Sequence, residues 1–291
     1  MSTAGQVLAS SRPLSWINTA FPFGAAYLLA GGGLDAAFWL GCLYFLVPYN
    51  LLMYGVNDVF DYESDLRNPR KGGVEGIVLD RRIHAVTIRS AIVSNLPFVV
   101  ALAVLGSTVS NLVLAISVFA VAAYSVPVLR FKERPFLDSI TSSTHFVSPA
   151  VYGLALADAR GGSVDVDVTV VAALVGFFAW GVGSHAFGAV QDVMADRAAG
   201  IGSIGTALGA RATTWFALVA YVAGGLCLLA LPWPGTLAAV LAIPYVVNIA
   251  PYLSITDETC ERANAAWRRF LWLNFATGFL VTQLLIWITV R

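Results

Sequence analysis

Charged residues are scarce in this sequence. Only 12% of its 291 residues are Asp, Glu, Lys or Arg, whereas 58% are hydrophobic. Because a soluble domain carries about twice this share of charge, the composition excludes a soluble domain of ordinary kind. The formal net charge is zero, but this says little, because the distribution of charge matters more than the sum; no nucleic-acid partner is expected.

Cysteine and histidine are also rare, with three residues of each. Cys42 and Cys227 fall in apolar runs and Cys260 in a polar segment. No pair predicts a disulfide and none has metal-ligand spacing. The first eleven residues are polar or mildly apolar and lead straight into an apolar run, so no cleavable signal is expected.

Long charge-free runs, by contrast, cover most of the chain. Roughly 20 apolar residues span a bilayer, and two of the runs are long enough for two spans each, with breaks at Gly106-Ser107-Thr108 and Pro232-Trp233-Pro234-Gly235. The runs are Pro13–Leu34, Ala36–Asn57, Ser90–Leu129, Ser139–Ala157, Val168–Gln191, Ala212–Thr256 and Phe270–Val290. We predict an all-α polytopic membrane bundle of nine transmembrane helices that forms a single domain over residues 1–291.

The basic residues predict which side of the membrane each segment faces. With the N-terminus in the cytoplasm, all but Arg160 and Arg291 of the 17 Lys and Arg residues lie in cytoplasmic segments, as the positive-inside rule requires. This predicts a multi-pass protein of the cell membrane with a cytoplasmic N-terminus and an external C-terminus. The longest cytoplasmic segment, residues 59–84, is either a cap loop that closes over a site or an ordinary solvated connection.

Two acidic motifs follow the second and sixth predicted spans. The first contains Asn57, Asp58, Asp61 and Asp65, and the second contains Asp192 and Asp196. On a helix, steps of four residues place side chains on one face. Asn57, Asp61 and Asp65 therefore form one stripe, whereas Asp58 lies about 100° around the helix from it.

These motifs predict a magnesium site. Charges at a membrane boundary are costly and are usually kept for function, and two facing acidic stripes would repel each other without a cation. Oxygen ligands together with substrate phosphates are what Mg²⁺ prefers, so we predict Mg²⁺ as the cofactor, bridging a diphosphate. The predicted metal ligands are Asn57, Asp58, Asp61, Asp65, Asp192 and Asp196. Nearby cytoplasmic residues could bind the outer phosphate oxygens: Arg67, Lys71, Tyr124, Arg130 and Lys132.

A diphosphate at the rim of an apolar bundle predicts a lipid tail as the rest of the substrate. Bound metal would stabilise the departing diphosphate, and dry aromatic walls would shield an allylic cation from water. Two histidines could act as a base or polar relay: His185, seven residues before Asp192, and His145, in a polar patch of the fifth span. A buried histidine is more often structural, so both interpretations stay open for each.

Three stretches of the sequence resemble the UbiA superfamily of intramembrane prenyltransferases. They are Asn-Asp-x-x-Asp-x-x-x-Asp from Asn57, Tyr-Ser-x-Pro-x-x-Arg-x-Lys from Tyr124, and Asp-x-x-x-Asp from Asp192. Within that superfamily, the stretch from Asn57 to Gly76 and those around Arg130-Phe131-Lys132 and Thr141-Ser142-Ser143 are most like bacterial lycopene elongases of the C50 carotenoid pathway. The resemblance covers essentially the whole chain and implies a UbiA-like fold.

The resemblance implies Mg²⁺-dependent transfer of dimethylallyl groups from dimethylallyl diphosphate to the two ends of lycopene, giving C45 and C50 carotenoids. It also implies membrane lipid and other enzymes of that pathway as partners. By the same resemblance, Arg67, Lys71 and Lys132 assist the leaving group. The metal–diphosphate site falls to Asn57, Asp61, Asp65, Asp192 and Asp196. Gly200 stands where a further acid would extend the second stripe, so the second metal position is expected to be less fully ligated.

Two alternatives remain at this level. An ion-coupled transporter also carries intramembrane acids, but its acids should lie near the bilayer midplane rather than at the rim. Alternatively, a UbiA-type enzyme could prenylate a quinone, haem or chlorophyll precursor. Neither periodicity nor spacing identifies the acceptor.

Overall fold

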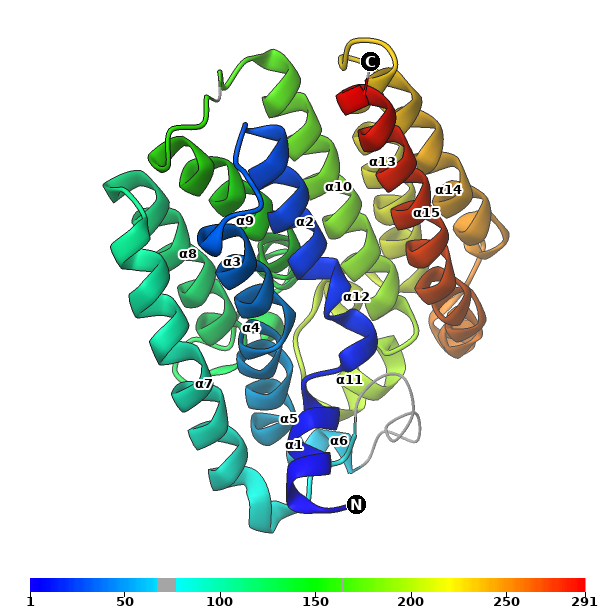
Figure 1. The fold of residues 1–291 in the computed structure, drawn as a ribbon. Helices are drawn as coiled ribbons and strands as arrows, with labels where there is room; N and C mark the ends of the chain where they lie inside the picture. The colour runs from blue at the N-terminus through cyan, green and yellow to red at the C-terminus, as the bar shows by residue number, and fades with distance from the viewer. Residues whose placement is uncertain (67–76, 164, 291) are drawn as a thin grey trace. The chain divides into compact units, whose positions relative to one another are not determined.

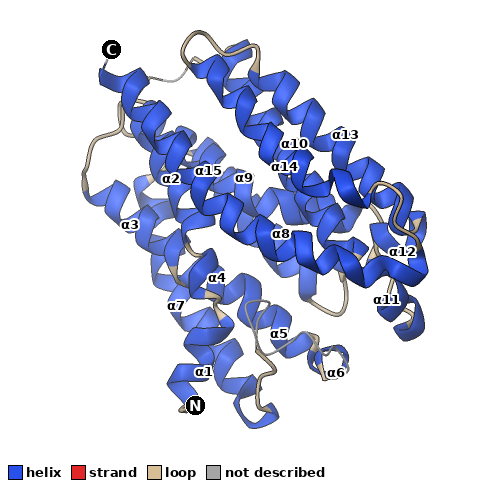
Figure 2. Cartoon of the chain, turned by 90° about the vertical axis from the view of Figure 1, so that its right-hand side faces the viewer, coloured by secondary structure: helices blue, strands red, loops and turns tan. Residues whose placement is uncertain are grey.

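The computed structural model describes residues 1–66, 77–163 and 165–290, and this part of the chain is built from helices and turns without a strand (Figures 1 and 2). The chain divides into two compact units, each with its own hydrophobic core. Unit 1 comprises Met1–Phe131 and His145–Val164, and unit 2 comprises Lys132–Thr144 and Asp165–Arg291. The all-α prediction is confirmed.

Unit 1 contains the first acidic motif. Its long helices α7 and α8 run as neighbours (Figure 1), and the shorter elements before them lead to the motif. The elements are α1 (Thr3–Ser10), η1 (Pro13–Ser15), α2 (Ile17–Leu29), α3 (Ala36–Leu46), α4 (Pro48–Asn50), η2 (Leu51–Gly55), α5 (Val56–Phe60), α6 (Tyr62–Asp65), η3 (Arg81–Ile83), α7 (His84–Leu105), α8 (Thr108–Ser125) and the later part of α9 (Leu137–Ala159).

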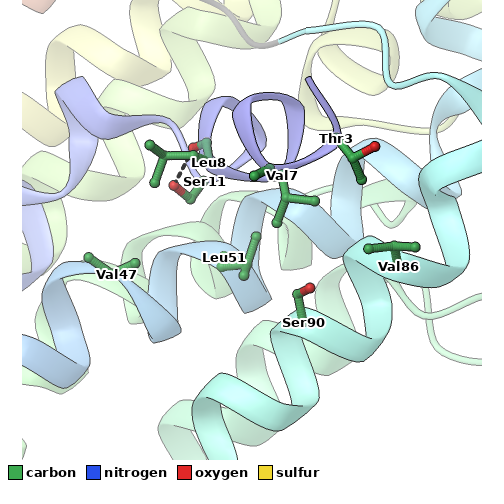
Figure 3. A pocket seen from close by; sticks show the side chains of 9 residues that line it. Thr3, Val7, Leu8, Ser11, Val47, Leu51, Val86 and Ser90 are labelled. Carbon is green, nitrogen blue, oxygen red and sulfur yellow. Dashed lines mark hydrogen bonds between the residues drawn. The ribbon is translucent and has the colours of Figure 1, made fainter. Parts of the chain in front are cut away.

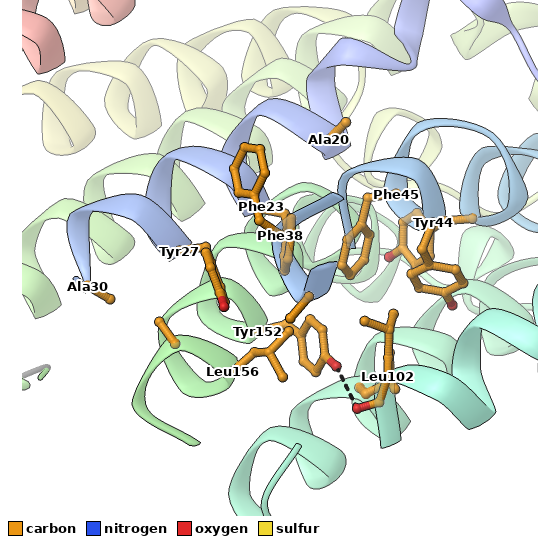
Figure 4. Packing of buried hydrophobic residues seen from close by; sticks show 14 of the residues in the cluster. Ala20, Phe23, Tyr27, Ala30, Phe38, Tyr44, Phe45, Leu102, Tyr152 and Leu156 are labelled. Carbon is orange, nitrogen blue, oxygen red and sulfur yellow. Dashed lines mark hydrogen bonds between the residues drawn. The ribbon is translucent and has the colours of Figure 1, made fainter. Parts of the chain in front are cut away.

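The core of unit 1 is aromatic (Figure 4). The ring of Phe23 lies 5.3 Å from that of Phe45 and 5.9 Å from that of Tyr152, centroid to centroid, within the range of favourable ring contacts. Gly41 allows this packing, because a Cβ atom at position 41 would overlap the Phe23 ring. The Tyr152 hydroxyl donates to the carbonyl of Leu102 at 3.4 Å, so its polar end is satisfied inside the core.

Unit 2 contains the second acidic motif. Its helices are the beginning of α9, α10 (Val168–Val190), α11 (Val193–Ala199), α12 (Ile204–Leu208), α13 (Ala210–Leu228), η5 (Gly235–Ala242), α14 (Ile243–Ile249), η6 (Ala250–Tyr252), η7 (Asp257–Ala263) and α15 (Asn264–Val290). Helices α10 and α13 lie side by side. A Cβ atom on Gly176 would lie 3.0 Å from the Gly224 carbonyl oxygen, so these glycines permit the close backbone approach that is typical of membrane helices.

Helix starts in both units are fixed by short polar side chains. Asp35 accepts the N–H of Phe38 at the start of α3, and Ser107 accepts the N–H of Ser110 at the start of α8. Asp167 does the same at the start of α10. Such caps satisfy N–H groups that have no partner within the helix, and they fix the residue at which each helix begins.

Seven helical segments of the described chain are long and apolar enough to cross a membrane, so the protein is a multi-pass membrane protein. They are Ala36–Phe60, Arg81–Leu105, Thr108–Ser125, Val168–Val190, Ala210–Leu228, Gly235–Tyr252 and Asp257–Val290. Helices also stand at the two other expected places. However, α2 has only 13 residues, because the chain turns through η1 first, and α9 carries a polar patch. The count of nine spans stays a prediction.

Candidate functional site

The first acidic motif follows a change of helical pitch. Leu51–Gly55 forms a π-helical turn, and α5 and α6 come directly after it; such turns occur often at functional sites. The N–H of Asp61 donates to the Asn57 carbonyl at 2.9 Å, and the N–H of Asp65 donates to the Asp61 carbonyl at 2.8 Å. The backbone therefore keeps the predicted step of four residues.

Asn57 is oriented by the end of α8. The hydroxyl of Ser125, which is fully buried, donates to Oδ1 of Asn57 at 3.0 Å. The neighbouring residue Tyr124 contacts His145 edge-on, with ring centroids 5.2 Å apart. His145 is only 2% exposed and its carbonyl accepts the Tyr49 hydroxyl. Tyr124 and His145 thus form a packed pair in unit 1.

Arg130 reaches the motif from the turn after α8. Its Nη2 lies 3.7 Å from Oδ1 of Asp61, and its N–H donates to the Val126 carbonyl at 2.9 Å. The φ of Arg130 is +41°, in the left-handed region that side chains other than glycine rarely adopt. Backbone strain of this kind gathers at functional sites, so the conformation supports a role for the Arg130 side chain.

Asp58 faces another way. It is completely buried, and its Oδ1 lies 3.2 Å from Nη2 of Arg12, whose guanidinium also sits 4.3 Å above the Tyr54 ring centre. Burial lowers the pKa of Arg12, but attraction by Asp58 and Tyr54 outweighs it and raises the pKa, so Arg12 stays charged. We expected Asp58 as a metal ligand; the structure gives it an ion pair with a residue 46 positions away that nothing in the sequence signals.

The second acidic motif begins at the end of α10. Asp192 precedes α11, and the N–H of Asp196 donates to the Asp192 carbonyl at 2.8 Å. Gly200, with φ +71°, then ends the helix, and the N–H of Ile201 donates back to the Asp196 carbonyl. This left-handed ending is what glycine provides. The absence of a further acid at position 200 therefore reflects the end of the helix.

Unit 2 also holds a buried acid that our sequence reasoning missed. Asp138 is fully buried and accepts the N–H groups of Ser139 and Ile204, both at 2.7 Å. The hydroxyl of Ser139 lies 3.0 Å from Nδ1 of His185. An acid at the very start of the fifth span was the available signal. His185 is thus tied to the start of α9.

The predicted site residues fall into three groups. Unit 1 brings Asn57, Asp61, Asp65 and Arg130 together, with Tyr124 and His145 also in that unit; unit 2 holds Lys132, His185, Asp192 and Asp196. Arg67 and Lys71, like the rest of residues 67–76 in the predicted cap loop, lie outside the described residues.

The ligand atoms that the first motif offers are of the type that binds magnesium. The side chains of Asn57, Asp61 and Asp65 carry the oxygen ligands that this ion prefers, and Mg²⁺ is typically held by one or two carboxylates while water and substrate phosphates complete its octahedron. Over residues 1–66, 77–163 and 165–290, no group of three or more His, Cys, Asp or Glu side chains could hold a metal ion by itself.

Comparison with known proteins gives concordant matches. The model of the UbiA prenyltransferase family matches residues 19–276. A C50 β-cyclic carotenoid biosynthesis protein of Dietzia sp. is 55% identical over 281 residues, which are 96% of this chain but only 63% of that protein. A lycopene elongase/hydratase of Corynebacterium glutamicum is 51% identical over 96% of both chains.

A solved structure shares the fold. A UbiA homologue from Archaeoglobus fulgidus, bound to DMAPP and Mg²⁺, has a TM-score of 0.61 at 18% identity and covers 94% of this chain and 99% of its own.

Proposed function

Since this chain belongs to the UbiA prenyltransferase family, we propose that it transfers dimethylallyl groups from dimethylallyl diphosphate to the ends of lycopene. The observation that carries this proposal is the 51% identity, over 96% of both chains, to a lycopene elongase/hydratase. The second relative, a C50 carotenoid biosynthesis protein, supports the same acceptor, although this chain spans only 63% of its length.

We propose that the two acidic motifs share the metal–diphosphate site. Its oxygen ligands would be Asn57, Asp61, Asp65, Asp192 and Asp196. Bound Mg²⁺ would neutralise charge on the departing diphosphate. A solved homologue that holds DMAPP and Mg²⁺ supports this choice of cofactor.

Basic residues would complete the diphosphate site. Arg130, at 3.7 Å from Asp61, is placed to exchange part of its contact with that carboxylate for a phosphate oxygen, since guanidinium groups bind both with similar geometry. We also propose Lys132, Arg67 and Lys71 as phosphate contacts.

The acceptor needs no strong base before the bond forms. An allylic cation adds directly to an electron-rich alkene, so lycopene has only to be placed against it, and loss of a proton or addition of water resolves the new cation afterwards. His145 and His185 stay candidates for that last step. Lycopene is too long to be enclosed, so we propose that one end enters from the lipid and that the molecule reverses for the second transfer.

We propose that the acidic motifs face the cytoplasm, with a cytoplasmic N-terminus and an external C-terminus. The distribution of all but two basic residues supports this orientation. Dimethylallyl diphosphate would then reach the site from the cytoplasm, and lycopene from the membrane.

The test is product analysis in a host that accumulates lycopene. We expect a C45 and a C50 carotenoid from the wild-type chain, and neither from Asp192→Ala, which removes one proposed metal ligand. The variant protein should be present in the membrane at the wild-type level. No extended carotenoid from the wild-type chain, together with prenylation of an added aromatic acid, would place the protein in another branch of the family.

A further inference from the structure

The N-terminal segment is fastened to the helix that carries the first acidic motif. Helix α1 lies across η2 and α7 (Figure 3). At the last residue of α1, the Ser10 hydroxyl donates to the Val7 carbonyl at 2.8 Å. Ser10 also lies close to Gly55 of η2, because a Cβ atom on Gly55 would be only 3.2 Å from Ser10 Oγ. The Trp16 indole donates to both the carbonyl and the hydroxyl of Ser11. The chain on both sides of Arg12 is therefore held by specific contacts.

Helix α1 packs against this helix through Val7, which contacts the buried cluster of Leu51, Val56 and Ala91. A pocket of about 480 Å³ lies beside this contact, with Val7 and Leu8 on one side and Leu51 and Val86 on the other. The close approach of Ser10 to Gly55 and the ion pair of Arg12 with Asp58 add specific restraints between the N-terminal segment and the helix that leads into α5.

Arg12 itself is held in an unusual backbone conformation. Its φ of +52° is in the left-handed region, which costs a residue other than glycine conformational energy. This conformation accompanies a guanidinium aimed at the buried Asp58 and stacked over Tyr54. Arg12 and Arg130 are two of only three such residues in the described chain, the third being Phe136, and both contact a carboxylate of the first motif.

The ion pair with Arg12 restrains one face of α5, the face that carries Asp58. Successive residues on a helix are separated by about 100°, so holding Asp58 toward Arg12 leaves Asn57 about 100° and Asp61 about 60° around the helix from it, on opposite sides. The π-helical turn at Leu51–Gly55 precedes α5 directly, and a turn of this kind shifts the register of the residues after it. A second restraint is therefore needed to fix which face carries the ligands.

We infer that Arg12 is a positioning residue for the diphosphate site: by binding Asp58 it fixes the rotation of α5, so that Asn57 and Asp61 present their oxygens while Asp58 takes no metal. This inference rests on the proposed function for the identity of the ligand. It deepens that function by separating Asp58 from the metal ligands. Residues that orient ligands in this way typically change metal affinity about 10- to 100-fold when removed.

The chain offers a matched control. Arg81 pairs with Glu63 at 2.8 Å and sits 5.4 Å from the Tyr62 ring centre, so it repeats the Arg–acid–Tyr arrangement close to the same motif. Both of its charged side chains are exposed, at 72% and 66%. An exposed pair of this kind contributes little, so Arg81→Ala should leave ligand binding unchanged.

The test measures binding of inorganic pyrophosphate with Mg²⁺ to the purified full-length chain by isothermal titration calorimetry, which needs neither acceptor nor turnover. We expect Arg12→Ala to weaken binding by at least about tenfold and Asp58→Asn, whose amide oxygen can still accept from Arg12, to stay near the wild type. The double variant R12A/D58N should bind more tightly than R12A, because it no longer leaves a buried carboxylate without its ion-pair partner.

The measured affinities of the variants can overturn the inference in two ways. Wild-type affinity in R12A overturns the inference, as does a D58N variant as weak as R12A, which would make Asp58 a metal ligand. If R12A fails to fold, as unpaired buried charge can cause, D58N and R12A/D58N carry the decision: the inference requires the double variant to bind more weakly than D58N. Failure of the wild-type chain to bind pyrophosphate with Mg²⁺ overturns the proposed function and the inference together.

Discussion

Replacing Arg130 by glycine separates what its backbone does from what its side chain does. The residue is held at φ +41° beside Asp61. Glycine adopts this conformation without steric cost, whereas alanine keeps the strain and loses the guanidinium. Comparing R130G with R130A therefore isolates the strain, because both variants lose the same ion pair.

Relief of the backbone strain raises stability, whereas loss of the guanidinium lowers the rate. A left-handed conformation costs a residue other than glycine about 1–2 kcal/mol, so R130G should be more stable than R130A by about 1 kcal/mol. Loss of a hydrogen bond to a charged group is worth about 1.5–3 kcal/mol, which corresponds to about 10- to 100-fold in rate at about 1.36 kcal/mol per tenfold. Both variants should therefore be slow, and R130G should be the more stable of the two.

Two measurements on purified protein in detergent check this. The first is the midpoint of thermal unfolding, monitored by tryptophan fluorescence. The second is the initial rate of extended carotenoid formation from lycopene and dimethylallyl diphosphate. R130K is the matched control, since it keeps the positive charge and the backbone strain, and we expect an intermediate rate from it.

Either of two results would refute this reasoning. A wild-type rate in R130G would mean that the guanidinium makes no contact with the diphosphate. A midpoint for R130G at or below that of R130A would mean that the strain of the left-handed backbone is no larger than the entropy that glycine adds to the unfolded chain.

Three further results are expected. Asp61→Ala, or chelation by EDTA, should abolish turnover, reversibly for EDTA; activity in both conditions would remove the metal hypothesis. Gly41→Val should lower the unfolding midpoint, since the new side chain overlaps Phe23 and overpacking costs about 1–3 kcal/mol. A cysteine at Arg82 should resist a membrane-impermeant thiol reagent added to intact cells while one at Ser163 reacts; the reverse pattern would invert the topology.

Much of the local structure could be predicted directly from the sequence. Charge-free runs predicted the apolar helices, because each span must satisfy its backbone internally. The step of four from Asn57 to Asp61 to Asp65 is present in the backbone hydrogen bonds. Position 200 was expected to lack an acid because it is glycine. The left-handed φ of Gly200 gives the reason, since the helix ends there.

Long-range contacts could not be predicted in the same way. Arg12 is one of many cytoplasmic basic residues by sequence, and its pairing with Asp58 depends on α1 folding back onto η2. Asp138 stood at the edge of a predicted span, yet its two N–H donors include Ile204, 66 positions away. The shortness of α2 was also missed. The run from Pro13 was expected to form one helix, but Pro13–Ser15 forms a separate 3-10 turn and α2 begins only at Ile17.

The π-helical turn at Leu51–Gly55 has a consequence for how this chain tolerates changes in length. A π turn is an α-helical turn that contains one additional residue. Deletion of Leu52 would let the helix close with ordinary α-helical spacing, so the additional residue would be lost and Asn57 and Asp58 would keep nearly the directions they have now. We therefore expect a single-residue deletion inside this turn to be tolerated better than one inside α3, where no residue is additional and a deletion rotates everything after it by about 100°.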